Sequence, residues 1–201
     1  MARKPYARHP KTAARRETII QAALACFVEL GFASTTVEDI RRRSKASNGS
    51  LYHHFTNKDQ LAVAVYLQGL TVYQTGLLKA LERNPEAGSG VHAIVRYHLD
   101  WVRNHPDWAR YLLEMRHAEF MVGSEAAIAD QNHRFMERVV RWLERHIESG
   151  ALRRLPPDLF LSLIIGPCQE YTRLRLAGRA QAKLSVAIEE LAQAAWLSVR
   201  G

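Results

Sequence analysis

The chain lacks most of the features that mark an enzyme or a metal protein. It has two cysteines in 201 residues, Cys26 and Cys168, which lie far apart and form no C-x-x-C spacing for zinc. No glycine-rich phosphate loop, H-E-x-x-H or G-x-S-x-G motif is present. The sequence therefore predicts a protein that is not an enzyme, carries no metal ion or other cofactor, and keeps its thiols reduced.

Long hydrophobic runs are missing too. No apolar stretch approaches the roughly 18 residues that span a membrane, and the first residues lack the apolar segment of a signal peptide. Convincing strand patterns and internal repeats are also absent. Because hydrophobic residues still make up 47% of the chain, a packed core is expected. We expect a soluble, cytoplasmic protein that has no membrane partner.

Acidic residues are too few to balance the basic ones. The formal net charge is +8, and residues 1–60 alone hold 11 Lys/Arg against 5 Asp/Glu. Such a balance favours a polyanionic partner, either nucleic acid or an acidic membrane surface. Residues 1–11 are basic and contain two prolines, which predicts a mobile arm. The alternative is a basic tail that only aids solubility.

Helical periodicity dominates the rest of the sequence. Apolar residues recur at spacings of three and four, and glycine or proline interrupts them at positions such as Gly31, Pro106 and Gly123. This pattern predicts an all-α fold of nine helices. A small basic domain would occupy residues 1–56, and a larger helical domain would occupy residues 57–201.

Two short helices are expected between residues 36 and 55. Thr35 and Thr36 precede Glu38 as in a capping box, in which the glutamate reaches back to the helix start. Residues 44–46 form a turn, and Ser47 is a suitable N-cap for the second short helix. Two short helices joined by a three-residue turn are typical of the helix-turn-helix motif.

The second of these helices has the chemistry of a DNA-reading element. Ser47, Asn48 and Ser50 are small, polar side chains that let a helix approach base edges in the major groove and exchange hydrogen bonds with them. Gly49 leaves no side chain between the backbone and a phosphate group. Backbone amides at a helix N-terminus also attract phosphate.

The region resembles the tetracycline-repressor (TetR) family of transcription regulators. The resemblance spans residues 15–61, under a third of the chain, and only the combined string is specific. The residues that carry it are Thr35-Thr36-Val37-Glu38-Asp39-Ile40, then Ser47-Asn48-Gly49-Ser50-Leu51-Tyr52-His53-His54-Phe55, and then Lys58-Asp59-Gln60-Leu61. The resemblance implies a homodimer that binds a pseudo-palindromic operator in double-stranded DNA, and a repressor released by a small apolar or amphipathic ligand.

The resemblance also implies residue roles. Thr36, Tyr52, His53 and Lys58 look like phosphate contacts, and Leu51 looks like a core residue, as does Phe55. The DNA-binding set that we predict is Thr36, Arg42, Lys45, Ser47, Asn48, Gly49, Ser50, Tyr52, His53 and Lys58.

Several of these positions have a second interpretation. Tyr52 could be purely structural, and Arg42 lies in a run of three arginines that could be a solvated surface. Metal binding by His53 and His54 is not expected, because adjacent helical residues point to different faces. Lys45 stands where the family usually has glycine in the turn. A left-handed conformation there would cost a non-glycine residue roughly 1–2 kcal/mol.

The larger domain is implied to bind the ligand and to form the dimer. Its aromatic and soft side chains suit an apolar pocket, although they also suit an ordinary core. The pocket residues that we predict are Trp101, Trp108, Tyr111, Met115, Phe135 and Tyr171. The last two helices each carry an apolar stripe, which suits a four-helix dimer interface or burial within one chain. Gly166-Pro167 would kink the first of these two helices. The interface residues that we predict are Leu163, Leu174, Ile188, Leu191 and Ala195. The competing function is a helical interaction module or membrane-surface protein without an operator.

Overall fold

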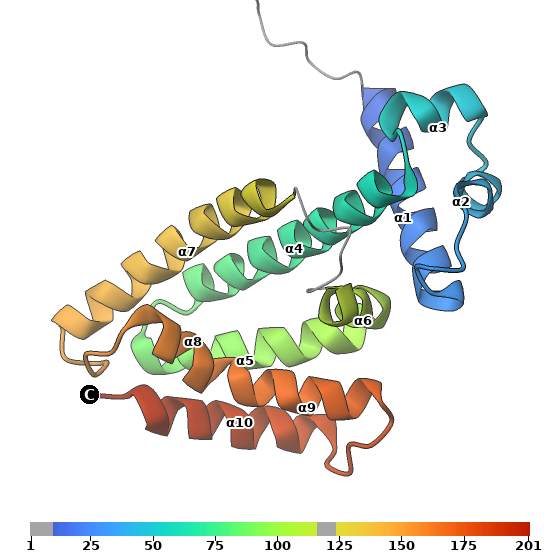
Figure 1. Ribbon diagram of the computed structural model, residues 1–201. Helices are drawn as coiled ribbons and strands as arrows, with labels where there is room; N and C mark the ends of the chain where they lie inside the picture. The colour runs from blue at the N-terminus through green and yellow to red at the C-terminus, as the bar shows by residue number, and fades with distance from the viewer. Residues whose placement is uncertain (1–9, 116–123) are drawn as a thin grey trace, which may run out of the picture. The chain divides into compact units, whose positions relative to one another are not determined.

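The computed structural model describes residues 10–115 and 124–201, and the described chain is helical (Figure 1). Most of the expected N-terminal arm and the break expected at Gly123 lie outside these residues. The helices are α1 (Pro10–Leu30), α2 (Val37–Ser44), α3 (Asn48–His54), α4 (Lys58–Arg83), α5 (Ala87–Asn104), α6 (Pro106–Glu114), α7 (Glu125–Glu148), α8 (Pro157–Ile164), α9 (Gly166–Leu176) and α10 (Leu184–Val199). Within the described residues the only β-type pairing is one isolated bridge between Leu152 and Arg200. The predicted all-α fold is confirmed.

The predicted kink at Gly166-Pro167 divides one expected helix into α8 and α9. Ile165 between them keeps a helical backbone, with φ −96° and ψ −30°, so the chain bends without leaving helical geometry. Pro167 supplies no backbone N–H and disfavours the regular helix before it. With α8 and α9 counted as one kinked helix, the described residues hold the nine helices that the periodicity predicts.

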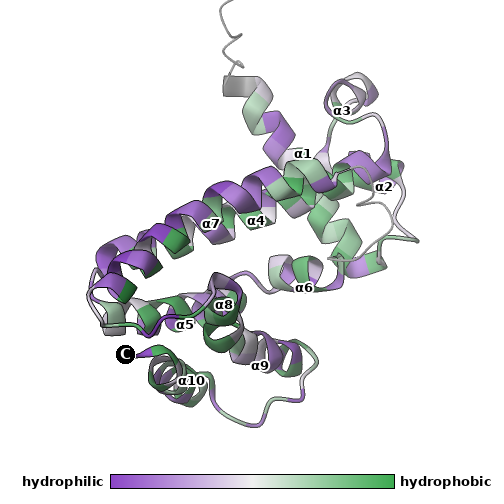
Figure 2. Ribbon diagram, turned by 60° about the vertical axis from the view of Figure 1, so that its left-hand side comes forward, coloured by the Kyte–Doolittle hydropathy of each residue, from purple (hydrophilic) through white to green (hydrophobic). Residues whose placement is uncertain are grey.

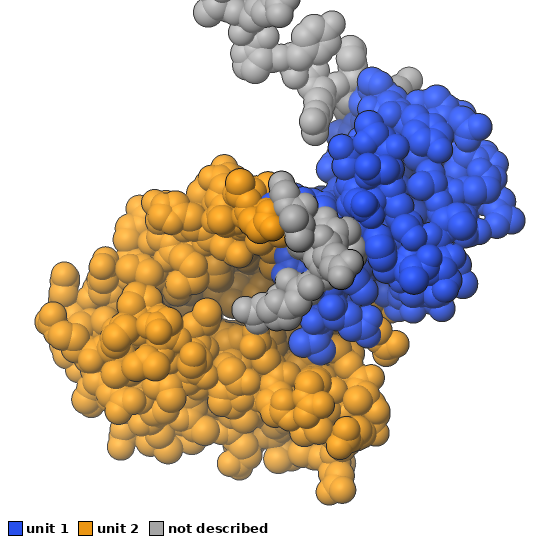
Figure 3. Space-filling view, viewed as in Figure 1, with its two compact units in different colours: residues 1–68, 111–124 blue, residues 69–110, 125–201 orange. Residues whose placement is uncertain are grey.

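The chain divides into two compact units (Figure 3). Unit 1 holds residues 1–68 and 111–124, and unit 2 holds residues 69–110 and 125–201. Helix α4 contributes its first part to unit 1 and the remainder to unit 2.

Unit 1 forms a small core around α1. Ile20 of α1, Ile40 of α2 and Leu51 of α3 are almost fully buried, and α1 packs against α2. Tyr111 closes this core, because its ring stacks on Phe27 at 5.7 Å and its hydroxyl donates to the Ala62 carbonyl at 3.0 Å. Helices α1, α2 and α3 are therefore held together by burial of their apolar side chains.

Unit 2 is a helical bundle in which α5 packs against α10, α8 and α9. Figure 2 shows many hydrophobic residues along α10, whereas much of α7 is hydrophilic. One buried cluster holds the bundle together. It includes Val91, Val95, Leu99, Phe160, Cys168, Ala192 and Val199.

A polar network crosses this apolar core at His98. The Tyr73 hydroxyl lies 2.8 Å from His98 Nδ1, and the Thr172 hydroxyl lies 3.3 Å from its Nε2. The Tyr97 hydroxyl donates to the Tyr73 carbonyl at 2.9 Å. His98 is 7% exposed, and burial lowers its pKa from 6.5 to about 4. The imidazole is therefore neutral near pH 7, with both ring nitrogens engaged.

Helix α4 corrects the expectation that no apolar stretch of the chain approaches the length of a membrane span. Among the described residues it is long and apolar enough to cross a membrane by length and composition, with half of its most apolar window buried inside the protein. The core helix of a soluble protein passes the same test, so this is weak evidence for a membrane span.

We predict that His98 makes stability depend on pH. The unfolded chain takes up a proton near pH 6.5 and the folded chain only near pH 4, so the unfolded state binds more protons between these values. The free energy of unfolding should therefore fall by up to about 3 kcal/mol as pH drops from 6.5 to 4. Urea unfolding of the wild type and of His98→Gln at several pH values measures the difference. If the free energy of unfolding changes equally with pH in the two proteins, His98 is not the cause of the pH dependence, whatever their absolute stabilities.

Candidate nucleic-acid interface

The first short helix starts one residue later than the sequence suggested. Thr36 is the N-cap of α2, and its hydroxyl accepts from the Asp39 amide at 3.1 Å while Asp39 bonds back to the Thr36 amide at 3.0 Å. The expected partner Glu38 instead pairs with Arg41 at 2.6 Å. Thr35 is unavailable as a cap, because it is buried and its hydroxyl donates to the Cys26 and Gly31 carbonyls. The predicted capping box exists, with Asp39 as its acidic member.

Hydrogen bonds keep Asp39 ionised. The Thr36 hydroxyl contributes most, followed by the Thr36 amide and the Arg42 guanidinium, and together they hold the pKa of Asp39 at about 2. A permanent carboxylate at the start of α2 also interacts favourably with the helix dipole.

The turn between α2 and α3 places Lys45 in a left-handed conformation, with φ 52° and ψ 33°. Lys45 is the one non-glycine residue with positive φ in the described chain. Its amide bonds to the Arg42 carbonyl at 3.2 Å, and the Ala46 amide bonds to the Arg41 carbonyl at 3.2 Å. These two bonds are the Schellman arrangement that glycine usually completes. Backbone strain at Lys45 is thus part of the motif.

Helix α3 is anchored by two side chains and presents the rest to solvent. Leu51 and Phe55 are buried, as predicted. Ser47 is the N-cap, and its hydroxyl accepts from the Ser50 amide at 3.2 Å, which confirms the predicted cap. Asn48 is exposed, and Tyr52 is 55% exposed. An exposed helix with small polar residues at its N-terminal end has the form of a major-groove reader.

Basic residues on α2 are held in exposed ion pairs. Arg41 pairs with Glu38 and Arg42 with Asp39, each at 2.6 Å, and Arg43 pairs with Glu29 of α1. Ion pairs at the surface contribute little to stability because water screens them. The Arg42 side chain is 67% exposed, so its guanidinium can leave Asp39 for a phosphate at small cost.

Lys58 has a different environment from the other predicted phosphate contacts. Its ammonium donates to the carbonyls of Phe32, Ala33 and Thr35 at 2.9, 3.3 and 3.0 Å, and lies 4.4 Å from the centre of the Phe32 ring. All three hydrogen bonds that an ammonium can donate are therefore used within the chain. This arrangement ties the loop after α1 to the start of α4.

Most of the predicted DNA-binding residues are exposed to solvent. Ser50 and Lys58 are the two exceptions, because they are half-buried. The exposed ones are Thr36, Arg42, Lys45, Ser47, Asn48, Gly49, Tyr52 and His53. His53 and His54 meet edge to face at 5.1 Å. Among the described residues no group of three or more His, Cys, Asp or Glu side chains is placed to hold a metal ion.

The residues predicted for the ligand pocket do not share one environment. Tyr111 belongs to the core of unit 1, and Met115 is a half-buried residue of the same unit. Trp101 and Trp108 are buried in unit 2. Two more residues of that unit, Phe135 of α7 and Tyr171 of α9, pack against its core.

Trp101 lines a cleft of about 490 Å³ between α4 and α5. Val72, Tyr97 and Asn104 line it too. The Trp101 indole is 6% exposed and meets Tyr73 edge to face at 5.1 Å. Its N–H has no hydrogen-bond partner in the described chain.

The residues predicted for the dimer interface are more buried than expected for a free surface. Ile188 and Ala195 are 6% and 3% exposed, because the core of unit 2 already covers them. Leu163, Leu174 and Leu191 are half-buried. The most exposed apolar side chains of α8 and α10 are Leu159, Leu161, Val186 and Leu197. The sequence pattern placed Leu159 in one of the stripes but did not identify the other three, because periodicity does not tell which side of a stripe the chain itself covers.

Comparisons with known proteins agree with this geometry. Residues 19–65 match the family model described as bacterial regulatory proteins, tetR family. The regulator RutR of Escherichia coli K12 is 25% identical over 164 residues, which cover 79% of this chain and 74% of RutR. The repressor KstR2 of Mycolicibacterium smegmatis is 42% identical over 53 residues, 26% of each chain.

A solved structure shares the fold. A TetR-family transcription regulator from Marinobacter aquaeolei superposes with a TM-score of 0.77 at 19% identity, over 94% of this chain and 97% of that one. The fold and the exposed, capped α3 define a helix-turn-helix DNA-binding protein. Residues 19–65 carry the tetR-family motif, and the comparisons support a TetR-family transcriptional regulator.

We predict opposite effects of Lys45→Gly on stability and DNA affinity. Glycine removes the strain of the left-handed residue, so the free energy of unfolding should rise by roughly 1 kcal/mol. If the ammonium contacts a phosphate, the slope of log affinity against log salt should become shallower by about 0.9. Denaturant unfolding and salt-dependent DNA binding measure the two effects. Lys45→Ala is the matched control, because it removes the charge and keeps the strain. An unchanged salt slope in both variants would remove Lys45 from the DNA contacts.

Proposed function

We propose that the protein acts as a homodimeric repressor that binds a pseudo-palindromic operator and releases it on binding a small apolar or amphipathic effector. The observation that carries the DNA part is the exposed N-terminal end of α3, where Ser47 caps the helix and Asn48 and Gly49 face solvent. Donors and acceptors at this position suit base edges. KstR2 is named a transcriptional repressor, and we extend that role to this chain.

The basic surface of α2 and α3 would hold the operator backbone. Arg42 and Lys45 provide exposed positive charge, and Tyr52 and His53 extend the surface along α3. Phosphate contacts position a reading helix without carrying sequence information. Lys58 would support this surface indirectly, by fixing the start of α4 to the loop after α1.

The proposed effector site is the cleft that contains Trp101. Its volume lies within the range of small-molecule sites, and the unpartnered indole N–H would donate to an acceptor on the ligand. Helix α4 lines the cleft with Val72 and also contributes residues to unit 1. A ligand that favours one position of α4 would alter the spacing of the two reading helices. By linkage, it must bind the DNA-free protein more tightly than the DNA-bound protein.

A dimer is needed because one reading helix covers few base pairs. The exposed face of α10 is suited to self-association. Val186, Ala194 and Leu197 are exposed at helical spacing, with Glu190 as the charged residue among them. Leu161 of α8 is 46% exposed and adds to the apolar surface of this unit. The proposed location of the working protein is the cytoplasm, where its DNA is.

We expect Asn48→Ala to relax base preference at one operator position per half-site. Loss of a base-edge hydrogen bond should cost about 1–3 kcal/mol against the preferred base and little against the others. Selection of bound duplexes from a random pool, followed by sequencing, gives the preference of each protein. Arg42→Ala is the comparison, because a lost phosphate contact should weaken all sequences alike. If the wild type selects no site, the proposed function itself is wrong, and the interaction-module interpretation replaces it.

A charge at Leu197 should separate the subunits. Leu197 is 49% exposed in the single chain, so Leu197→Glu should leave the fold intact while burying a carboxylate in the proposed interface. Sedimentation should then report a monomer, and circular dichroism should show that it keeps its helical content. Leu30→Glu makes the same change at a leucine of unit 1 that is 50% exposed, and it should remain dimeric. A Leu197→Glu protein that stays dimeric would exclude this face of α10 as the interface.

A further inference from the structure

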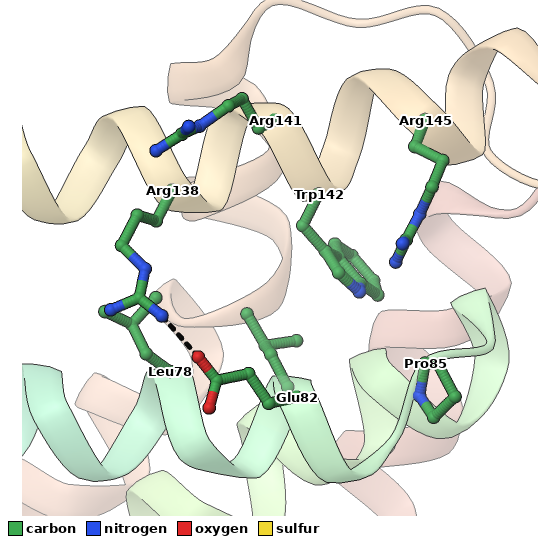
Figure 4. A pocket seen from close by; sticks show the side chains of 8 residues that line it. Leu78, Glu82, Pro85, Arg138, Arg141, Trp142 and Arg145 are labelled. Atoms are coloured by element: carbon green, nitrogen blue, oxygen red, sulfur yellow. Dashed lines mark hydrogen bonds and ion pairs between the residues drawn. The ribbon is translucent and has the colours of Figure 1, made fainter.

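We propose that a second groove, between α4 and α7, binds an amphipathic organic anion, meaning a carboxylate or phosphate group joined to an apolar body. The groove has a volume of about 380 Å³. Leu78, Leu81 and Glu82 of α4 line one side, and Arg138, Arg141, Trp142 and Arg145 of α7 line the other (Figure 4). We call it the α4–α7 groove. All of these residues belong to unit 2 and are distinct from the predicted DNA, effector and dimer residues.

The apolar part of the groove is held in a fixed position. Trp142 is 8% exposed and meets His146 edge to face at 4.5 Å. Its ring reaches Gly90 of α5, where an added Cβ would lie 2.3 Å from Trp142 Cζ2, so only a glycine leaves room for the indole. Leu81 beside it is 4% exposed. An apolar ligand group would therefore meet a preformed surface and would not have to order it first.

The charged part of the groove carries more positive than negative charge. Arg138, Arg141 and Arg145 recur at spacings of three and four, which puts them on one face of α7. Glu82 pairs with Arg138, as the dashed line in Figure 4 shows. Within the described residues no ion pair is found for Arg141 or Arg145, and Arg141 donates from Nε to the Glu137 carbonyl at 3.2 Å.

Neighbouring guanidinium groups without carboxylate partners favour an anion. Like charges at this spacing destabilise a helix slightly, and a bound anion would remove that cost. The planar fork of arginine matches the two oxygens of a carboxylate or phosphate. Arg141 and Arg145 are therefore the groups expected to hold the head of the ligand, with Arg138 kept in position by Glu82.

An unsatisfied donor in the same groove is the third observation. Trp142 Nε1 is buried and has no hydrogen-bond partner in the described chain. Figure 4 shows the indole nitrogen on the ring edge that faces Arg145 and Pro85. A buried N–H without an acceptor is costly. An anion oxygen held by Arg145 would supply the missing acceptor, and the apolar body would then lie against Leu78 and Leu81. The sugar-phosphate backbone of a DNA duplex has no apolar group that would lie against Leu78 and Leu81.

The test measures binding of two probes to the full-length protein without DNA. Decanoate supplies the carboxylate source and decyl phosphate the phosphate source, and titration calorimetry gives affinity and stoichiometry. We expect saturable binding of at least one probe at one site per chain. The double variant Arg141→Gln/Arg145→Gln should weaken it by about 10- to 100-fold, since hydrogen bonds to charged groups contribute about 1.5–3 kcal/mol.

Matched controls locate the site. Arg134→Gln removes an exposed arginine of the same helix, which pairs with Asp130 at 2.6 Å outside the groove, and should bind like the wild type. Trp142→Phe keeps an aromatic side chain but lacks the indole N–H, so affinity should fall severalfold. Decan-1-ol, without charge, should bind at least tenfold more weakly than the better anion.

The proposal would be overturned by saturable binding of neither anion, by equal binding of the alcohol, or by wild-type affinity in the double variant. Loss of anion binding in Trp101→Phe alone would also overturn it, because the probe would then occupy the cleft and not the groove. Operator binding by the double variant without ligand should equal that of the wild type. A failure of the groove is thereby distinguished from a failure of DNA binding.

Discussion

Burial of a few apolar side chains around α1 is the constraint on which the DNA-binding surface depends. Helices α2 and α3 have 8 and 7 residues, too short to be stable alone. Ile40 and Leu51 bury almost completely and fix these helices. The opposite face of α3 is left to solvent as a direct consequence. The reading surface therefore has its shape because the other side of each short helix is buried.

The strained turn at Lys45 also depends on this burial. The Schellman bonds to Arg41 and Arg42 close α2, and the left-handed residue redirects the chain into α3. Strain of this kind persists only where surrounding packing determines the backbone. Here Ala46, which directly follows, is 3% exposed. Burial of Ala46 thus holds the backbone of Lys45 in its left-handed conformation, and the Lys45 side chain can carry its charge toward solvent.

Unit 2 combines a rigid core with unsatisfied polar groups. His98 bridges α4 and α9 through Tyr73 and Thr172, and burial keeps it neutral. Two tryptophans of the same unit, Trp101 and Trp142, have N–H groups without partners in the described chain. Each lies beside a hollow in the surface. Donors of this kind usually find a partner in folded proteins, and both support the inference that unit 2 binds small molecules.

Local sequence patterns were sufficient to predict the helices and the DNA-binding motif. Helical periodicity, the cap at Ser47 and the breaks at glycine and proline are set by near neighbours in the chain, so the sequence alone predicts them. The kink at Gly166-Pro167 follows from proline chemistry alone. The resemblance over residues 15–61 identified the family for the same reason, because those residues form one local motif.

Tertiary structure decided which chemical groups are available. Thr35 looked like a cap, but its hydroxyl is used by the Cys26 and Gly31 carbonyls, and the helix begins at the next residue. Lys58 looked free, yet three carbonyls from the loop after α1 surround its ammonium. Ile188 looked available to a partner, yet its own chain covers it. Sequence spacing determined which face of a helix each residue occupies. Only the packing of distant segments decided which faces stay open, because burial depends on contacts between residues far apart in the chain.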